Sequence, residues 1–470
     1  MEFDGIVANG DVLQHGEIRP LDIAFRRGTI AAVSTPGTFN GATANVIDAR
    51  GRLVLPGAID SHFHVRAPSH PEREDFGSAT AAAAAAGVTA IVEMPISEPP
   101  TTTGTRLRDR ADLARREAYI DVGFYASSAT LSRDDLLGSL DAGALAFKAF
   151  LQQVPPGRES EFDGLCLATT GELLDAFRLL AEFDLPCVFH AEDEPMIRRL
   201  EARLRQAGRM DGAAHAESRP DVVEAVSVGT LLRLGEAFGV HVHVPHVSSG
   251  MTVSLIRDAK ARGIAVTAET CPHYLHFDAE SLTRLGPYAK CNPPFKTPRD
   301  VEAVWAGVMD GTIDTLASDH APFTKAEKDR ARDDIWTAPP GFPGGEILVP
   351  FAIGAALDGR LPWRRVEALL YEQPARIFGL WPTKGVIRPG ADADLVLYNP
   401  DDRGVFDSHT LRCKNSETAR LWDGVPRIGA VEMTLLRGET VFDGSRISGR
   451  IGGGRQLRRG QTSVVNAVAG

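Results

Sequence analysis

Cysteine is scarce in this sequence: there are five in 470 residues, and no two of them form a CxxC pair. An odd number of cysteines in a chain of this length does not suggest a disulfide framework. The expected compartment is therefore a reducing one, most simply the cytoplasm. The five are Cys166, Cys187, Cys271, Cys291 and Cys413.

Long apolar runs and dense basic blocks are also missing. The alanine run Ala81–Ala86 is too short to span a bilayer and predicts a close-packed helix instead. The N-terminal residues include early acids and no signal-peptide core, so neither a signal peptide nor a membrane span is expected. The formal net charge of -11 argues against binding to nucleic acid, and small-molecule partners are expected.

Between Pro56 and about Leu380 the chain alternates short β-rich apolar runs with amphipathic helical stretches. This alternation is typical of βα units around a parallel sheet. Eight such runs predict an α/β protein with a (β/α)8 barrel, also called a TIM barrel. The runs are residues 53–64, 88–95, 121–127, 144–151, 186–193, 240–249, 264–275 and 314–322, and helices are expected over Gly171–Phe183, Ser254–Gly263 and Val301–Gly311.

The two ends of the chain have a different pattern, with short alternating strands broken by glycine. Segments such as LDIAFRRGTIAAVS (21–34) and EMTLLRGETVFDG (432–444) contain no clear helix. We predict a small β-sandwich domain built from residues 1–55 and 383–446, a barrel domain over 56–382, and a flexible glycine-rich tail over 447–470.

Potential metal ligands follow several of the predicted strands. His62 and His64 alternate along the first run, which places both side chains on one face of a strand. A single histidine on a strand is more often a packed residue than a ligand, but the joint pattern suits zinc or a similar divalent ion. Lys148 does not fit this pattern, because a protonated lysine cannot ligate a cation. The other candidate ligands at strand ends are His190, His246 and Asp319.

Six motifs occur in the order and at the strand ends that are found in the cyclic amidohydrolases. They are DSHFHVR (60–66), FKAF (147–150), FHAED (189–193), PHVSS (245–249), ETCPHYL (269–275) and SDHAP (318–322). The chain resembles this family, which includes dihydroorotases, allantoinases, hydantoinases and dihydropyrimidinases, from about Pro56 to the segment that begins at Lys384. Segments 91–103 and 190–211 are most similar to L-type hydantoinases and allantoinases.

The resemblance implies a binuclear centre and explains Lys148. In such enzymes this lysine is carbamylated by carbon dioxide, and the carbamate bridges two divalent ions, here expected to be zinc, with manganese or cobalt as alternatives. By the same resemblance His62, His64 and Asp319 hold one ion, and His190 and His246 hold the other. Asp319 is also the expected general base, which passes a proton from the attacking hydroxide to the departing ring nitrogen.

Two further histidines fall at active-site strand ends. His273 and His320 are expected to orient ligands or substrate from behind the centre. His241 and His243 also alternate along a strand but lack the serine-rich turn that follows His246, so they are expected in the core or behind the metal ligands.

Arg66 is the first residue that bears on the substrate. In dihydroorotases the corresponding arginine binds the substrate carboxylate together with an asparagine and a histidine, whose positions are occupied here by Ile96 and Phe323. Each lost charged hydrogen bond costs about 1.5 to 3 kcal/mol, so dihydroorotate is disfavoured. A hydantoin with an apolar or aromatic substituent is expected instead. By the resemblance, the other substrate-binding candidates are Gln153, Cys291 and Asn292.

Allantoinase or dihydroorotase activity is the nearest alternative to this hydantoinase-like prediction. A mononuclear deaminase would lack Lys148, and a non-enzymatic scaffold related to dihydropyrimidinases would have lost ligands that are intact here. The resemblance also implies a homodimer or homotetramer.

Overall fold

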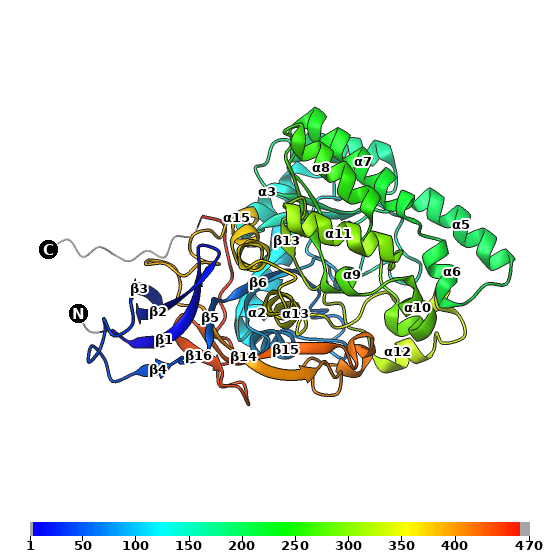
Figure 1. Cartoon of the computed structure of the whole chain (residues 1–470). Coiled ribbons are helices and arrows are strands. Elements are labelled where there is room, and N and C mark those ends of the chain that lie inside the picture. Colours follow the sequence, from blue (N-terminus) through cyan, green and yellow to red (C-terminus); the bar gives the residue numbers. More distant parts are fainter. Residues whose placement is uncertain (1–2, 461–470) are drawn as a thin grey trace.

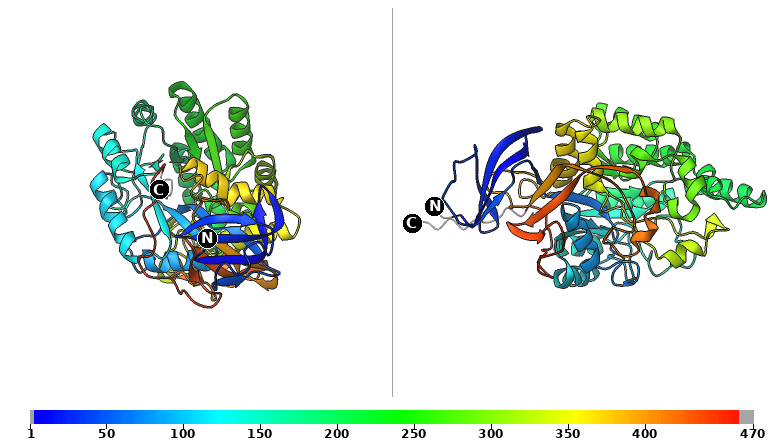
Figure 2. Two further views of the ribbon diagram at one scale, coloured as in Figure 1. Left: turned by 90° about the vertical axis from the view of Figure 1, so that its left-hand side faces the viewer. Right: turned by 60° about the horizontal axis from the view of Figure 1, so that its bottom comes forward.

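The computed structural model describes residues 3–460 of the chain. It contains a barrel surrounded by helices and a separate sheet made from both ends of the described chain (Figure 1). The sheet lies at one end of the barrel, and the second view of Figure 2 shows the two parts side by side. Among the described residues, no helix is long and apolar enough to cross a membrane.

The barrel consists of eight parallel strands in chain order, as the sequence predicts. The first and last strands close the ring, because Phe63 pairs with His320 and the His64 amide donates to the His320 carbonyl over 2.8 Å. The strands are β6 (Ala58–Phe63), β7 (Val88–Glu93), β8 (Asp121–Ser127), β9 (Ala146–Phe150), β10 (Cys187–His190), β11 (Val242–Val244), β12 (Val266–Thr270) and β13 (Thr315–Leu316).

Helices cover the outside of the barrel, and local sequence signals define many of their ends. Thr169 and Thr297 form capping boxes at the starts of α4 and α11, and Gly311 ends α11 in the left-handed conformation. The α-helices are α1 (Phe76–Ala85), α2 (Gly104–Glu117), α3 (Arg133–Ala142), α4 (Thr170–Leu180), α5 (Glu194–Gln206), α6 (Gly212–Glu217), α7 (Asp221–Phe238), α8 (Gly250–Ala261), α9 (Pro272–His276), α10 (Ala279–Leu285), α11 (Pro298–Asp310), α12 (Lys325–Asp329), α13 (Leu348–Leu357), α14 (Trp363–Glu367) and α15 (Gln373–Ile377). Shorter turns are η1 (Gly286–Ala289), η2 (Ile335–Thr337), η3 (Ala368–Glu372), η4 (Ser416–Thr418) and η5 (Arg420–Trp422).

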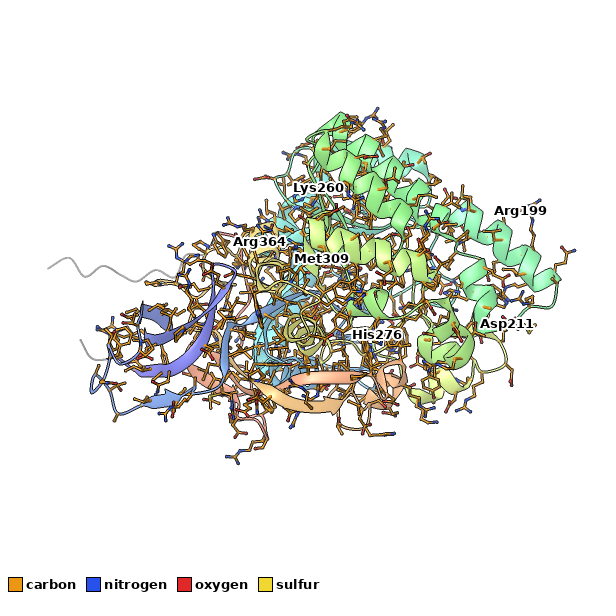
Figure 3. All side chains as sticks on the ribbon, in the orientation of Figure 1. Arg199, Asp211, Lys260, His276, Met309 and Arg364 are labelled. Carbon is orange, nitrogen blue, oxygen red and sulfur yellow. The ribbon has the colours of Figure 1, made fainter. Side chains whose placement is uncertain are left out.

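The predicted alanine-rich helix is α1. Ala82, Ala83 and Ala84 are buried in it, because their small side chains allow the helix to pack closely against its neighbours. Arg199 and Asp211, in contrast, carry charged side chains on α5 and just before α6, at the end of the molecule away from the small domain (Figure 3).

The second sheet forms the small β-sandwich domain predicted from the two ends of the sequence. Its strand order is β16-β15-β14-β5-β1-β2-β3, with β4 paired to β1. The predicted run 53–64 is divided between the domains at Gly57, where an added Cβ would lie 2.1 Å from Thr89 Oγ1. The strands are β1 (Gly5–Gln14), β2 (Glu17–Arg26), β3 (Thr29–Ser34), β4 (Val46–Asp48), β5 (Leu53–Pro56), β14 (Leu395–Val405), β15 (Pro426–Leu436) and β16 (Glu439–Phe442).

Residues 447–460, which the glycine-rich composition predicts to be flexible, lie against the barrel. Gln456 pairs with Val122 of β8, and Leu457 is buried in the apolar cluster beneath the barrel strands. Glycine permits this course, since an added Cβ at Gly454 would lie 1.9 Å from the Ile120 carbonyl oxygen. The rest of the predicted tail, residues 461–470, lies outside the described residues.

A buried lysine joins the small domain to the barrel. Lys384 Nζ lies 2.5 Å from Asp121 of β8, 2.8 Å from Asp392 and 2.7 Å from Asp394. Burial lowers the pKa of this lysine, but the three carboxylates outweigh that effect and raise it overall. The three aspartates could hold a metal ion by their spacing alone. Because the Lys384 ammonium contacts all three, we assign the cluster a structural role.

We predict that Lys384→Met strongly destabilises the protein. The substitution removes the ammonium that contacts all three carboxylates and leaves Arg437 paired with Asp121 only, and breaking a buried ion pair from one side costs about 3 to 5 kcal/mol. Denaturant unfolding followed by circular dichroism measures the change. Arg257→Met is the control, because Arg257 pairs with Asp310 at the surface, where such pairs contribute about 0 to 1 kcal/mol. Equal stability of the two variants would contradict this role of Lys384.

Candidate active site

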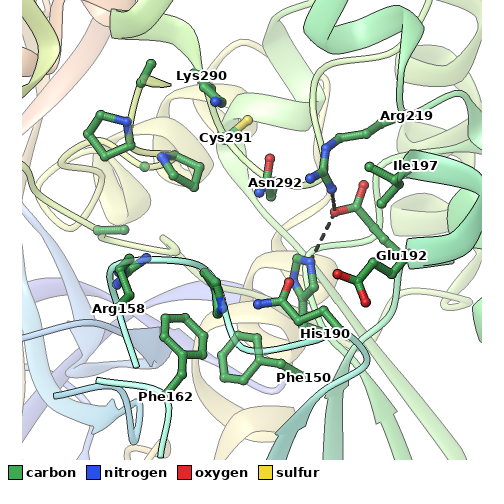
Figure 4. Close-up of a pocket in the computed structure, with 18 of the residues that line it drawn as sticks. Phe150, Arg158, Phe162, His190, Glu192, Ile197, Arg219, Lys290, Cys291 and Asn292 are labelled. Atoms are coloured by element: carbon green, nitrogen blue, oxygen red, sulfur yellow. Dashed lines mark hydrogen bonds and ion pairs between the residues drawn. The ribbon is translucent and has the colours of Figure 1, made fainter. Parts of the chain in front are cut away.

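A cavity of about 880 Å³ opens at the C-terminal ends of the barrel strands, where enzymes of this architecture carry their catalytic groups. It is lined by all six predicted ligands and by residues from the loops above them. Figure 4 shows that His190 and Phe150 lie on one side of the cavity, and Cys291 and Asn292 on another. The six predicted ligands are His62, His64, Lys148, His190, His246 and Asp319.

His62, His64 and Asp319 form the first group of possible ligands. Both histidine Nε2 atoms point to the same Asp319 oxygen, at 3.2 Å from His62 and 3.5 Å from His64. One ligand atom from each residue lies within 4.8 Å of the others, an arrangement that could hold a metal ion. Burial lowers the pKa of His64 to about 3, so its ring is neutral and able to ligate.

His190 and His246 form the second group. His190 Nδ1 lies 3.1 Å from His246 Nε2, while the other nitrogen of His190 contacts Glu192 at 3.1 Å (Figure 4). Burial lowers the pKa of both histidines. Two neutral imidazoles that direct nitrogen atoms to one point fit a shared cation.

Lys148 lies in the middle of β9 and is almost fully buried. Burial lowers its pKa to about 8, although the charges of Asp319 and Glu269 act in the opposite direction. Its own charge acts on His190 and His246. The lysine is therefore close to both groups, and its amine is neutral more often near neutral pH than that of an exposed lysine.

Two carboxylates that the sequence analysis did not identify support the histidines from behind. His62 Nδ1 lies 2.8 Å from Glu269 Oε1 on β12, and Glu192 contacts both His190 and Arg219. Burial by itself would raise the pKa of Glu269, but His62 and His243 outweigh it and hold that pKa well below its usual range. Such contacts fix the orientation of a metal-binding imidazole. The alternation in VTAET places Glu269 inward and could have indicated this role.

Three residues at the cavity have left-handed backbone conformations that non-glycine residues rarely adopt. These are Arg66 with φ 66°, His246 with φ 41° and Asp319 with φ 48°. Conformations of this kind cost on the order of 1 to 3 kcal/mol and are concentrated at functional sites. The surrounding contacts therefore hold these three residues in place against their local preference.

Five of the six predicted substrate contacts line the cavity, namely Arg66, Ile96, Gln153, Cys291 and Asn292. Phe323 differs: it is not among the lining residues, and its ring packs against Arg66, whose Cζ lies 4.7 Å from the ring centroid. Phe323 thus supports Arg66 instead of forming a wall. Burial lowers the pKa of Arg66 to about 9, and its Nε atom has no hydrogen-bond partner among the described residues.

His241, His243 and His273 lie around the site and do not line the cavity. His273 packs against Tyr274, Phe295 and Phe342, and burial lowers its pKa to about 4. His243 contacts Thr267 at 2.8 Å, and His241 contacts the same threonine at 2.9 Å.

The ring of His320 is buried and does not line the cavity. It stacks on Phe63 with 4.3 Å between ring centroids. His320 is therefore placed to support the end of the first barrel strand and not to contact a substrate.

Comparison with known proteins gives consistent results. Residues 53–441 match the model of the amidohydrolase family. The chain is 35% identical over 447 residues to the allantoinase of Rubrobacter xylanophilus, with 95% of each sequence covered. It is 32% identical over 459 residues to the L-hydantoinase of Paenarthrobacter aurescens, with 97% of this chain and 98% of that one covered.

The fold agrees with the sequence comparison. The solved L-hydantoinase (dihydropyrimidinase) from Arthrobacter aurescens superposes with a TM-score of 0.92 at 31% identity, covering 97% of this chain and all (100%) of that chain. A dihydropyrimidinase from Brevibacillus agri superposes with a TM-score of 0.88 at 25% identity, covering 97% of this chain and 98% of that chain. The likeness extends over both the barrel and the small domain.

We predict that Glu269→Gln weakens the affinity for divalent metal by about 10- to 100-fold, because the negative charge that orients the His62 ring is lost. Competition with a chromophoric chelator measures this affinity. Glu236→Gln is the matched control, since Glu236 pairs with Arg262 at the surface. Unchanged metal affinity in Glu269→Gln would show that the contact with His62 has no part in metal binding.

Proposed function

The chain belongs to the amidohydrolase family and is a metal-dependent hydrolase of cyclic amides, and from this premise we propose that a binuclear centre in its cavity opens the ring of a hydantoin. The observation that supports the centre most strongly is the convergence of two separate groups of buried histidines at the ends of the barrel strands. Asp319 belongs to the first group, and Lys148 lies near both.

In this proposal His62, His64 and Asp319 hold one divalent ion and His190 and His246 hold the other. Zinc suits this ligand set, with manganese and cobalt as alternatives. Lys148 would react as a neutral amine with carbon dioxide, forming an N–C bond and releasing a proton, and the resulting carbamate would offer one oxygen to each ion. Its lowered pKa favours the amine form that this reaction needs.

The chemistry that the ions supply when bound is to lower the pKa of a water molecule and to polarise the amide carbonyl. Asp319 directs one oxygen to His62 and His64, which leaves its second oxygen to accept a proton from the attacking water. It would then pass that proton to the ring nitrogen as the C–N bond breaks.

The walls of the cavity favour a hydantoin with an apolar or aromatic substituent. Ile96, Phe150 and Phe162 line the cavity and belong to one buried apolar cluster. Apolar walls with a few polar groups are typical of small-molecule sites. Cys291, Asn292 and Gln153 are proposed as the polar contacts to the ring and its substituent.

Allantoin is the second candidate substrate, because several relatives are named allantoinases and because Arg66 offers donors in the same cavity. Dihydroorotate remains the least favoured, since Ile96 stands where a polar partner of the carboxylate is expected. We also propose, from the resemblance, a homodimer or homotetramer in the cytoplasm.

We predict that the purified protein binds about two divalent ions per chain, and that Lys148→Ala binds fewer because the bridging carbamate is lost. Elemental analysis measures the metal, and intact-mass spectrometry under native conditions detects the carbamate. Lys325→Ala, which removes a lysine exposed on α12, is the control. Two tightly held ions in Lys148→Ala would contradict the bridging role.

We predict that Asp319→Ala keeps the fold but lowers kcat by roughly 10²- to 10⁴-fold, because the proposed proton acceptor is removed. The assay should compare 5-substituted hydantoins, dihydrouracil, allantoin and dihydroorotate, and we expect the fastest opening with an apolar 5-substituted hydantoin. Near-normal turnover by Asp319→Ala would remove this residue from proton transfer. Fastest turnover of allantoin would favour the second candidate.

A further inference from the structure

The seam that closes the barrel lies beside the proposed catalytic aspartate. His320 follows Asp319 directly, and its main chain pairs with Phe63 and accepts from the His64 amide over 2.8 Å. The two strand ends that carry His62, His64 and Asp319 are therefore joined through His320. Any shift at this residue changes the distance between Asp319 and the two histidines.

The His320 side chain makes a second connection, to the loop over the cavity. Its Nδ1 atom accepts hydrogen bonds from the amides of Gly344, at 3.3 Å, and Gly345, at 3.2 Å. This loop is continuous with Pro339–Gly341, which line the cavity. The packing is close, since an added Cβ at Gly345 would lie 2.7 Å from Phe63 and 3.3 Å from His320 Nδ1.

These contacts determine which nitrogen of His320 carries the proton. Two amide donors point at Nδ1, so Nδ1 must present a lone pair and the proton must be on Nε2. Nε2 lies 3.4 Å from Glu74 Oε2, within ion-pair distance, and neither atom makes a hydrogen bond within the described part of the chain. Glu74 is fully buried at the start of α1 and accepts from Ser78 through its other oxygen.

We propose that Glu74 and His320 act as a positioning pair for the reaction. Glu74 fixes the tautomer and the orientation of the His320 ring, and His320 in turn holds Asp319 against His62 and His64 and holds the loop over the cavity. Neither side chain lines the cavity, so the pair acts through Asp319 and not on the substrate.

The proposal rests on the ring-opening function proposed above, but the pair can also be tested without a substrate. Three variants separate its contacts. His320→Asn keeps an acceptor near the position of Nδ1 and loses the donor to Glu74. His320→Gln keeps a donor toward Glu74 and loses the acceptor, and Glu74→Gln keeps the shape and loses the charge. His241→Asn is the control, because His241 precedes β11 at the opposite end of the barrel.

The first readout is the visible absorption spectrum of the cobalt-substituted protein, which reports the ligand geometry around the metal. We expect His320→Asn and Glu74→Gln to change the spectrum while the protein remains folded and loaded with cobalt, and we expect His241→Asn to keep the wild-type spectrum. Identical spectra for wild type, His320→Asn and Glu74→Gln would overturn the proposal, whether or not the substrate is a hydantoin.

The second readout is kinetic. Each single variant should lower kcat for the metal-loaded enzyme by about 10- to 100-fold, with KM little changed because the substrate contacts remain. The double variant His320→Asn with Glu74→Gln should be no slower than the slower single variant, since the two residues act as one unit. Additive losses would overturn the coupling. If wild type opens no cyclic amide although the spectra change as expected, the proposed function fails and the positioning pair stands.

Discussion

The pairing of β6 with the segment after β13 is the constraint on which the site depends. This seam brings together residues that are more than 250 positions apart in the chain, and it places His62 and His64 against Asp319. The final strand has only two residues, Thr315 and Leu316, so the closure relies on the contacts of His320. The contacts that close the barrel therefore also determine the geometry of the predicted metal ligands.

Charge is the second constraint. The cavity is lined by buried cationic and imidazole side chains. Burial lowers the pKa of His64, Arg66, Lys148 and His246. Neutral imidazoles and a partly neutral amine are the forms that metal binding and carbamate formation require. Glu269 and Glu192 remain ionised behind the histidines, and they orient the rings without lying in the position of a ligand.

Much of this arrangement could be predicted from the sequence, because it follows from the local periodicity of apolar and polar residues. The eight strand positions, the two-part small domain and the inward direction of His62 and His64 follow from alternation and from the motifs. Contacts between distant segments could not be predicted. Phe323 packs under Arg66 instead of lining the cavity, residues 447–460 of the tail predicted to be flexible lie on the barrel, and Glu74 meets His320 only through the closed fold.

The most direct test of the binuclear centre is the position of metal in a crystal of the zinc-loaded protein, located by anomalous scattering at the zinc edge. We expect two peaks, one bound by His62, His64 and Asp319 and the other by His190 and His246, with continuous density joining both to Lys148. A single peak, or metal at Asp121, Asp392 and Asp394 instead, would contradict it.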